Sequence, residues 1–202
     1  MSYRVNTTEI SKATGLLKGA VSALEKAQMR AVNRVASKTR TAASKAIRQQ
    51  VKLPASYVNQ NLTVTKKATI TQPEAVISGR KRPTRLARYG AKQMTRVARG
   101  AAGDMVRGIA SGRKQAGVSV AVRKGGARKK MRKAFLIPLN GSGEMGVFVR
   151  TGRGKKDIKH LYGPSVDQVF NSVRNDLKPE IRRNLVSEYQ AQLAYALRKG
   201  IK

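Results

Sequence analysis

Basic residues set among glycines are the groups in this sequence whose types and spacing could do chemistry. They occur in Lys124-Gly125-Gly126-Ala127-Arg128 and in Gly152-Arg153-Gly154-Lys155-Lys156. Amides of glycine turns and neighbouring Lys or Arg side chains can together bind phosphate. Neither segment completes the nucleotide-binding spacing of Gly, four residues, then Gly-Lys-Ser/Thr. We therefore interpret both as flexible basic turns that hold phosphates without reading sequence.

Residues for enzymatic catalysis are sparse. His160 is the only histidine and there is no cysteine. The chain therefore lacks the residues that His-based triads, His clusters and thiolate zinc sites require. The 10 acidic residues are scattered along the chain, without the dense carboxylate grouping of two-metal nucleases. We expect no enzyme activity, no metal, no cofactor and no small-molecule substrate. A lone histidine beside a tight turn favours a structural role.

The charge balance is the extreme feature of the composition. The sequence has 43 Lys and Arg against 10 Asp and Glu, a formal net charge of +33 over 202 residues. Such a chain repels itself and requires a polyanion, with nucleic acid ahead of an anionic membrane surface. The segment Gly79–Lys133 holds 18 of the 43 cations and one acid, Asp104. The candidate contacts to DNA or another polyanion are Arg80, Lys81, Arg82, Arg85, Arg88, Lys124, Arg128, Lys129, Lys130, Arg132, Lys133, Arg153, Lys155 and Lys156.

The kind of nucleic-acid contact follows from the aromatic residues, which make up only 4% of the chain. Phe135, Phe148 and Phe170 lie inside apolar runs, and Tyr89 is the one aromatic residue in the basic middle. Base stacking on aromatic side chains is therefore a minor contribution. We expect backbone electrostatics to dominate, which are independent of sequence and sensitive to salt.

The elements that must position these residues begin with a helix over about 16–50. The stretch has no proline and abundant alanine, with apolar residues at spacings of three, four or seven. Its basic faces fit a solvated surface, or equally one turned to DNA or another subunit. Pro54 ends the helix and opens a short one through Tyr57 and Leu62. Strands are predicted over Thr63–Ile70 and Ala75–Ser78.

The middle and the end of the chain give the remaining elements. Gly79–Lys133 is expected to be a basic loop or insertion, ordered in an assembly, apart from a strand over 118–122. Ala134–Leu139 and Gly146–Arg150 predict a β-hairpin across Asn140-Gly141-Ser142-Gly143. Ser165 and Gln168 have the spacing of a capping box, so a helix starts there, and Pro179 should kink or split it.

This order predicts an α+β fold: a long N-terminal helix, a small, mostly antiparallel β-sheet with a basic insertion at about 79–133, and a C-terminal helix. The length favours one domain over 1–202. Met1–Lys18 lacks the pattern of a signal peptide, and no window approaches the roughly 18 apolar residues of a membrane span. We expect a soluble chain that is not secreted by a signal peptide.

Several segments, in order along residues 16–200, resemble the minor tail protein Z family of phages and prophages. The segment Gly146–Arg150 and the turn Leu161-Tyr162-Gly163-Pro164-Ser165-Val166 are similar to a strand and turn that precede the family's C-terminal helix. Val51–Val58, Ile77–Arg80 and Gly117–Gly126 resemble further family segments. The stretch Thr84–Ser111 departs from the family, because it looks longer than its counterpart.

The resemblance implies a structural role in tail completion. Such a protein joins the head-proximal end of a finished tail as a ring, which we take to be sixfold from the symmetry of tails. It supports head-tail joining and DNA passage. The implied partners are further copies of the chain, the tail terminator, other tail or connector proteins and genomic DNA, without a membrane. The implied location is the virion tail, with host cytoplasm during assembly.

Two alternatives stay open at this point. The basic charge also fits a free, non-sequence-specific nucleic-acid-binding protein, either nucleoid-like or ribosome-associated, and less well a polybasic membrane-surface protein. The turn formed by Leu161, Tyr162, Gly163, Pro164 and Ser165 has a structural interpretation: Gly and Pro set the backbone and Ser caps the helix, without touching a ligand.

Overall fold

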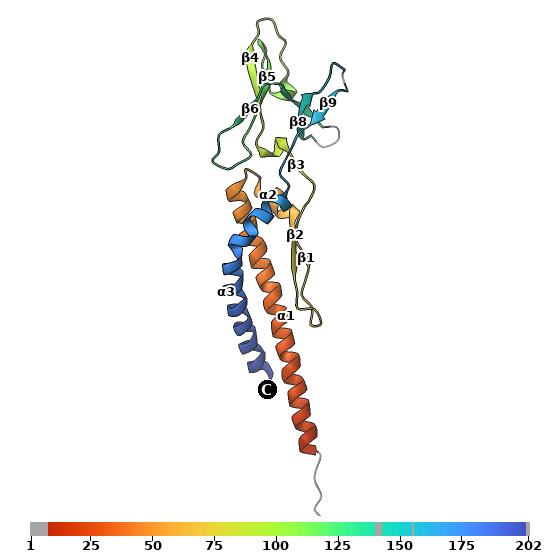
Figure 1. The fold of residues 1–202 in the computed structure, drawn as a ribbon, viewed down its shortest axis with the longest axis vertical. Helices are drawn as coiled ribbons and strands as arrows, with labels where there is room; N and C mark the ends of the chain where they lie inside the picture. Colours follow the sequence, from red (N-terminus) through yellow and green to blue (C-terminus); the bar gives the residue numbers. More distant parts are fainter. Residues whose placement is uncertain (1–7, 140–142, 155, 201–202) are drawn as a thin grey trace, which may run out of the picture. The chain divides into compact units, whose positions relative to one another are not determined.

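The computed structural model describes residues 8–139, 143–154 and 156–200 (Figure 1). The chain divides into two compact units, each described here by itself. The first unit comprises the described residues of Met1–Ala42, Thr63–Ser78 and the described residues of Asn175–Lys202; the second comprises Ala43–Leu62 and the described residues of Gly79–Arg174. The α+β class is confirmed, with three α-helices and small, largely antiparallel sheets among the described residues.

Helix α1 (Thr8–Gln50) confirms the predicted long N-terminal helix and begins earlier than Leu16. In the first unit, α1 lies alongside the C-terminal part of α3 (Val166–Gly200) (Figure 1). The small residues Ala27 and Ala31 of α1 are 1% exposed, so this face of the helix is covered. Glu188 of α3 accepts a hydrogen bond of 2.5 Å from Lys38 of α1, and this bond lowers the pKa of the Glu188 carboxyl.

The first unit also holds β1 (Leu62–Lys66) and β2 (Val76–Gly79), except for the end residues Leu62 and Gly79, and the two strands pair with each other. Both strands were predicted, but β1 stops short of the expected end at Ile70. The cause is Asn33 of α1, whose side-chain amide donates to the Ala68 carbonyl oxygen and accepts from the Ala68 amide, both at 2.9 Å. Because these bonds occupy the backbone of Ala68, a strand partner cannot use it.

The start of α3 confirms the predicted capping box. The Gln168 amide donates to the Ser165 hydroxyl at 3.0 Å, and the Ser165 amide donates to the Gln168 side-chain oxygen at 2.9 Å. Ser165 is 1% exposed, so these bonds satisfy groups that water cannot reach. Pro179 does not split the helix, which continues as one element to Gly200.

The second unit contains α2 (Ala55–Asn61), which Pro54 precedes as predicted. The predicted hairpin is confirmed as β7 (Ala134–Pro138) and β8 (Met145–Arg150), which pair in antiparallel fashion with Phe135 opposite Phe148. Its connection, residues 140–142, lies outside the described residues. Strand β9 (Ile158–His160) extends the sheet on the other side of β8.

The basic segment is more regular than the predicted loop. It contains β3 (Thr84–Arg85), the 3₁₀ helices η1 (Leu86–Tyr89) and η2 (Met105–Arg107), β4 (Lys92–Val97), β5 (Arg113–Val120) and β6 (Lys129–Met131). Strands β4, β5 and β6 form an antiparallel sheet. Apart from the 117–120 end of β5, the residues of these strands are exposed or partly buried, and they lack the alternation of apolar and polar residues by which strands are recognised.

Candidate anion-binding site

In the second unit, the basic segment begins at a stretch of backbone that hydrogen bonds hold in place. The Arg80 amide donates to the Asn61 carbonyl oxygen of α2 at 2.8 Å, and the Arg80 carbonyl oxygen accepts from the Asp167 amide of α3 at 3.3 Å. Gly79 is needed beside them, because a Cβ atom there would lie 2.8 Å from the Asp167 Cα atom. The path of the chain into the following arginines is therefore fixed at both neighbouring helices.

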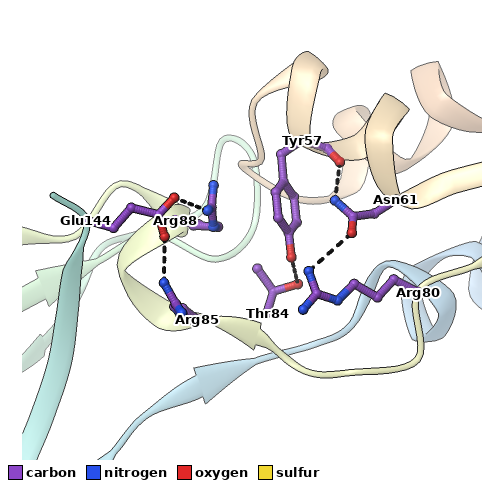
Figure 2. Close-up of polar contacts among 7 residues, drawn as sticks. All are labelled: Tyr57, Asn61, Arg80, Thr84, Arg85, Arg88 and Glu144. Atoms are coloured by element: carbon purple, nitrogen blue, oxygen red, sulfur yellow. Dashed lines mark hydrogen bonds and ion pairs between the residues drawn. The ribbon is translucent and has the colours of Figure 1, made fainter. Parts of the chain in front are cut away.

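Strand β3 fixes the next stretch. It pairs with β10 (Tyr162–Gly163), which places Thr84 opposite Gly163 and Arg85 opposite Tyr162. Thr84 is 1% exposed, and its hydroxyl lies 3.4 Å from the hydroxyl of Tyr57 (Figure 2). Thr84 thus holds the short strand in the interior of the unit. Arg85, the second residue of the strand, is partly exposed.

The turn before α3 packs on η1. Tyr89, the last residue of η1, is 0% exposed, and its hydroxyl donates to the Pro164 carbonyl oxygen at 2.5 Å. Burial raises the pKa of the Tyr89 hydroxyl to about 12, so it remains a donor at neutral pH. Gly163 lets the ring approach, because a Cβ atom there would lie 2.6 Å from it. The Leu161 amide donates to the Val147 carbonyl oxygen at 2.8 Å, which ties the turn to β8.

These anchors bring four arginines around one pocket of about 260 Å³ in the second unit. Glu144, which precedes β8, places its carboxylate between two of them. One carboxylate oxygen accepts from Arg85 at 2.6 Å and the other accepts from Arg88 (Figure 2). The pocket is lined by Tyr57, Arg80, Arg82, Pro83, Arg85, Arg88, Glu144 and Tyr162.

The guanidinium groups in this pocket are held in place by different partners. The Arg88 guanidinium lies 4.5 Å from the centre of the Tyr57 ring, a cation–π contact. Arg80 donates to the side-chain oxygen of Asn61 at 3.3 Å, and the Asn61 amide nitrogen donates to the Tyr57 carbonyl oxygen at 2.7 Å (Figure 2). Since Asn61 is neutral, Arg80 keeps its charge uncompensated by this bond.

A second group of candidate residues lies around β6. Lys129 pairs with Val120 and Lys130 with Ser119 of β5, and both lysine side chains are exposed. Lys124, Arg132 and Lys133 are exposed as well. These residues present positive charge on a surface, whereas the arginines of the pocket converge on one place.

A family model described as prophage minor tail protein Z (GPZ) matches residues 8–202. The chain belongs to this family. The resemblance seen in the sequence is thereby confirmed, and the protein is a minor tail protein of phages or prophages. No curated protein and no solved structure matched the chain.

Arg128, one of the candidate DNA-contacting residues of this minor tail protein, has a structural role. The Arg128 guanidinium donates to the carbonyl oxygens of Gly90 and Ser119, both at 2.7 Å, and to the Ser119 hydroxyl at 3.2 Å. These bonds tie the start of β6 to β5 and to the turn after η1. Arg128 therefore supports the sheet that carries the exposed lysines.

The turn at residues 152–156 is partly occupied by the protein's own carboxylate. The Gly154 amide, which a bound phosphate would need, donates to the Asp157 side chain at 2.9 Å. A Cβ atom at Gly152 would lie 2.5 Å from that carboxylate oxygen. Arg153 and Lys156 are exposed, and Lys155 lies outside the described residues. The backbone amide of this predicted phosphate-binding turn is thus already hydrogen-bonded to a side chain of the protein itself.

No described helix is long and apolar enough to cross a membrane. No group of three or more His, Cys, Asp or Glu side chains in the described ranges is arranged to hold a metal ion. His160 stacks on Phe148, with ring centres 4.4 Å apart and an angle of 20°. Burial, and secondly the charge of Arg85, lower the pKa of His160.

Three lining residues of the pocket, Tyr57, Pro83 and Glu144, were not among the candidates predicted from the sequence, and neither was Asn61, which accepts a hydrogen bond from Arg80. Glu144 is 59 positions from Arg85 and 56 from Arg88. No local spacing could have connected them, because pairing of β3 with β10 and of β7 with β8 creates the neighbourhood. The candidates Arg80, Arg82, Arg85 and Arg88 are brought together, while Lys81 is exposed but does not line the pocket.

Proposed function

We propose that this minor tail protein completes the head-proximal end of the phage tail. In this role a ring of subunits at the head-tail junction supports head-tail joining and the passage of DNA. Family membership supports a structural role in the tail. The observation that carries the finer assignment is the exposed positive charge around β6, on a chain whose net charge is +33.

The physical reason lies in the cost of assembling such charges. Subunits of +33 in a ring repel one another unless anions lie between or beside them. A genome that passes the ring supplies phosphates, and exposed lysines on a strand surface bind phosphates without reading the base sequence. A sixfold ring follows the symmetry of tails, and the tail terminator and connector proteins are the proposed neighbours.

Disruption of the gene in a producing prophage or phage tests this proposal. We expect lysates with DNA-filled heads and finished tails that are not joined, and recovery of infectious particles when the gene is supplied on a plasmid. Joined, infectious particles from the disrupted phage would contradict tail completion. A protein bound to bulk nucleic acid in the cell and absent from particles would instead support the free nucleic-acid-binding alternative.

A further inference from the structure

The arginine pocket already holds a carboxylate. Both oxygens of Glu144 are used, one by Arg85 and the other by Arg88, so the two guanidiniums are placed for a planar, two-oxygen acceptor. The side chains of Arg85, Arg88 and Glu144 are 38%, 32% and 36% exposed, so solvent and other molecules reach them. This site is therefore built for a carboxylate and remains open.

Glu144 leaves most of the pocket's charge uncompensated. Four guanidiniums line the pocket against one carboxylate, and the partner of Arg80 is the neutral side chain of Asn61. Arg82 is exposed at the same pocket. The pocket has a volume of about 260 Å³, so a further acidic group has room.

The walls between the arginines suit a peptide. The ring of Tyr57 lies against Arg88, and Pro83 and the 46% exposed Tyr162 add apolar surface. Such surfaces pack on the methylene groups and backbone of an acidic segment while guanidiniums bind its carboxylates. The contact of Arg80 with Asn61 and that of Arg88 with the Tyr57 ring fix these two groups before binding, which lowers the entropy lost on association.

Duplex DNA fits this recess less well than a protein carboxylate does. A duplex carries about one charge per 1.7 Å along a convex rod, so its affinity comes from cations spread over an exposed surface. Lys129 and Lys130 on β6 have that placement, whereas the arginines converge on a single anionic group.

We infer that the pocket lined by Arg80, Arg82, Arg85 and Arg88 docks an acidic segment of a partner protein. One carboxylate of that segment binds Arg80 and Arg82, and a second takes the place of Glu144 on Arg85 and Arg88. The inference assigns these four arginines to protein contact and leaves DNA contact to the residues around β6, so it stands independently of the proposed ring.

The test measures binding of the full chain to three probes: a short oligoglutamate peptide, inorganic phosphate and a mixed-sequence DNA duplex. Arg82→Gln and Arg80→Gln should each weaken peptide binding about tenfold, because each removes a charged hydrogen bond. Their effect on duplex binding should stay within about twofold. Both side chains are exposed, so the variants should fold, which thermal unfolding checks. Arg82→Lys should recover only part of the affinity, because lysine lacks the fork of donors.

Two further variants separate the docking site from the DNA surface. Glu144→Gln should strengthen peptide binding several-fold, because it removes the internal competitor. The double variant Lys129→Gln with Lys130→Gln should weaken duplex binding and leave peptide binding within about twofold.

The outcomes distinguish this inference from the proposed DNA contact. The inference is overturned if Arg80→Gln and Arg82→Gln leave peptide binding unchanged, or if they weaken duplex and phosphate binding as much as peptide binding. It is also overturned if Glu144→Gln weakens peptide binding in a folded protein. If the pocket variants behave as expected but the β6 variant binds duplex normally, the docking site stands and the DNA contact around β6 fails.

Discussion

The hydroxyl of Tyr89 donates a hydrogen bond of 2.5 Å to the carbonyl oxygen of Pro164, 75 positions further along the chain. This bond joins η1, which lies in the basic segment, to the turn that starts α3. The arginine pocket depends on the same turn, because β10 precedes Pro164 and pairs with β3. The turn predicted as structural from its sequence is thus the place where the basic segment is attached to the rest of its unit.

Replacement of Tyr89 by Phe should lower the free energy of unfolding by about 1–3 kcal/mol, because the Pro164 carbonyl oxygen loses the hydrogen bond from the buried Tyr89 side chain. Urea unfolding measures the change. Tyr189→Phe on α3 is a suitable control, since Tyr189 is half-buried and its hydroxyl has no comparable bond among the described residues, and the change should alter stability by less than about 0.5 kcal/mol. Equal effects of the two variants would show that the Tyr89 bond contributes nothing specific.

Replacement of Gly163 by Ala should also destabilise the protein, by about 1–3 kcal/mol, because the new Cβ atom would lie 2.6 Å from the Tyr89 ring. The matched control is Gly19→Ala in α1, where nothing lies within 4 Å of the new atom. That change should stabilise the helix by about 0.5–1 kcal/mol, because alanine is the better helix former. Opposite signs in thermal unfolding are the expected result, and the same sign for both would contradict the close packing at Gly163.

Acidification should weaken the fold through His160. Burial lowers its pKa below the ordinary 6.5, so the unfolded chain binds this proton more readily than the folded chain does. The free energy of unfolding is therefore at its full value above about pH 6.5 and decreases as the pH falls through the folded pKa. Urea unfolding at about pH 7.5 and about pH 5.5 measures this loss.

The variant His160→Phe provides the control for that titration. Its ring can keep the stacking with Phe148, and the Nε2 atom that it removes is buried without a hydrogen-bond partner. We expect the variant to lose the part of the pH dependence that belongs to His160. An unchanged difference between the two pH values would assign the effect to another group.

Neutralising the exposed cations around β6 should weaken DNA binding and its salt dependence. In the variant with Lys129, Lys130, Arg132 and Lys133 replaced by Gln, the slope of log affinity against log salt should decrease by up to about 0.9 per lost phosphate contact. Infectivity should fall while thermal unfolding stays nearly unchanged. Arg128 is kept, because its bonds to Gly90 and Ser119 hold the sheet together.

The matched control removes equal charge from the first unit, at the exposed α3 residues Lys178, Arg182, Arg183 and Arg198. This control should reduce the salt slope less than the β6 variant does. Equal slopes would mean that net charge, and not the surface around β6, governs DNA binding.

Features encoded within a few residues could be predicted from the sequence. The capping box of Ser165 and Gln168 spans one helical turn, and Pro54 restricts only its neighbours, so both appear in the structure as expected. The hairpin of β7 and β8 is equally local. In these cases the residues that determine the structure are neighbours in the chain.

Features that depend on distant contacts could not be predicted. Strand β1 ends early because Asn33, 35 positions before Ala68, occupies the Ala68 backbone. The arginines were identified as basic candidates, but the carboxylate that organises two of them is more than fifty positions away. No periodicity in the sequence indicates such long-range contacts, since each is created only when its own unit folds.

Electron cryo-microscopy of purified particles tests the central claim most directly. The proposal predicts density for this protein at the head-proximal end of the tail, as a closed ring whose β6 lysines face the DNA channel. Particles that lack the protein, or that carry it only at the opposite end of the tail, would contradict it.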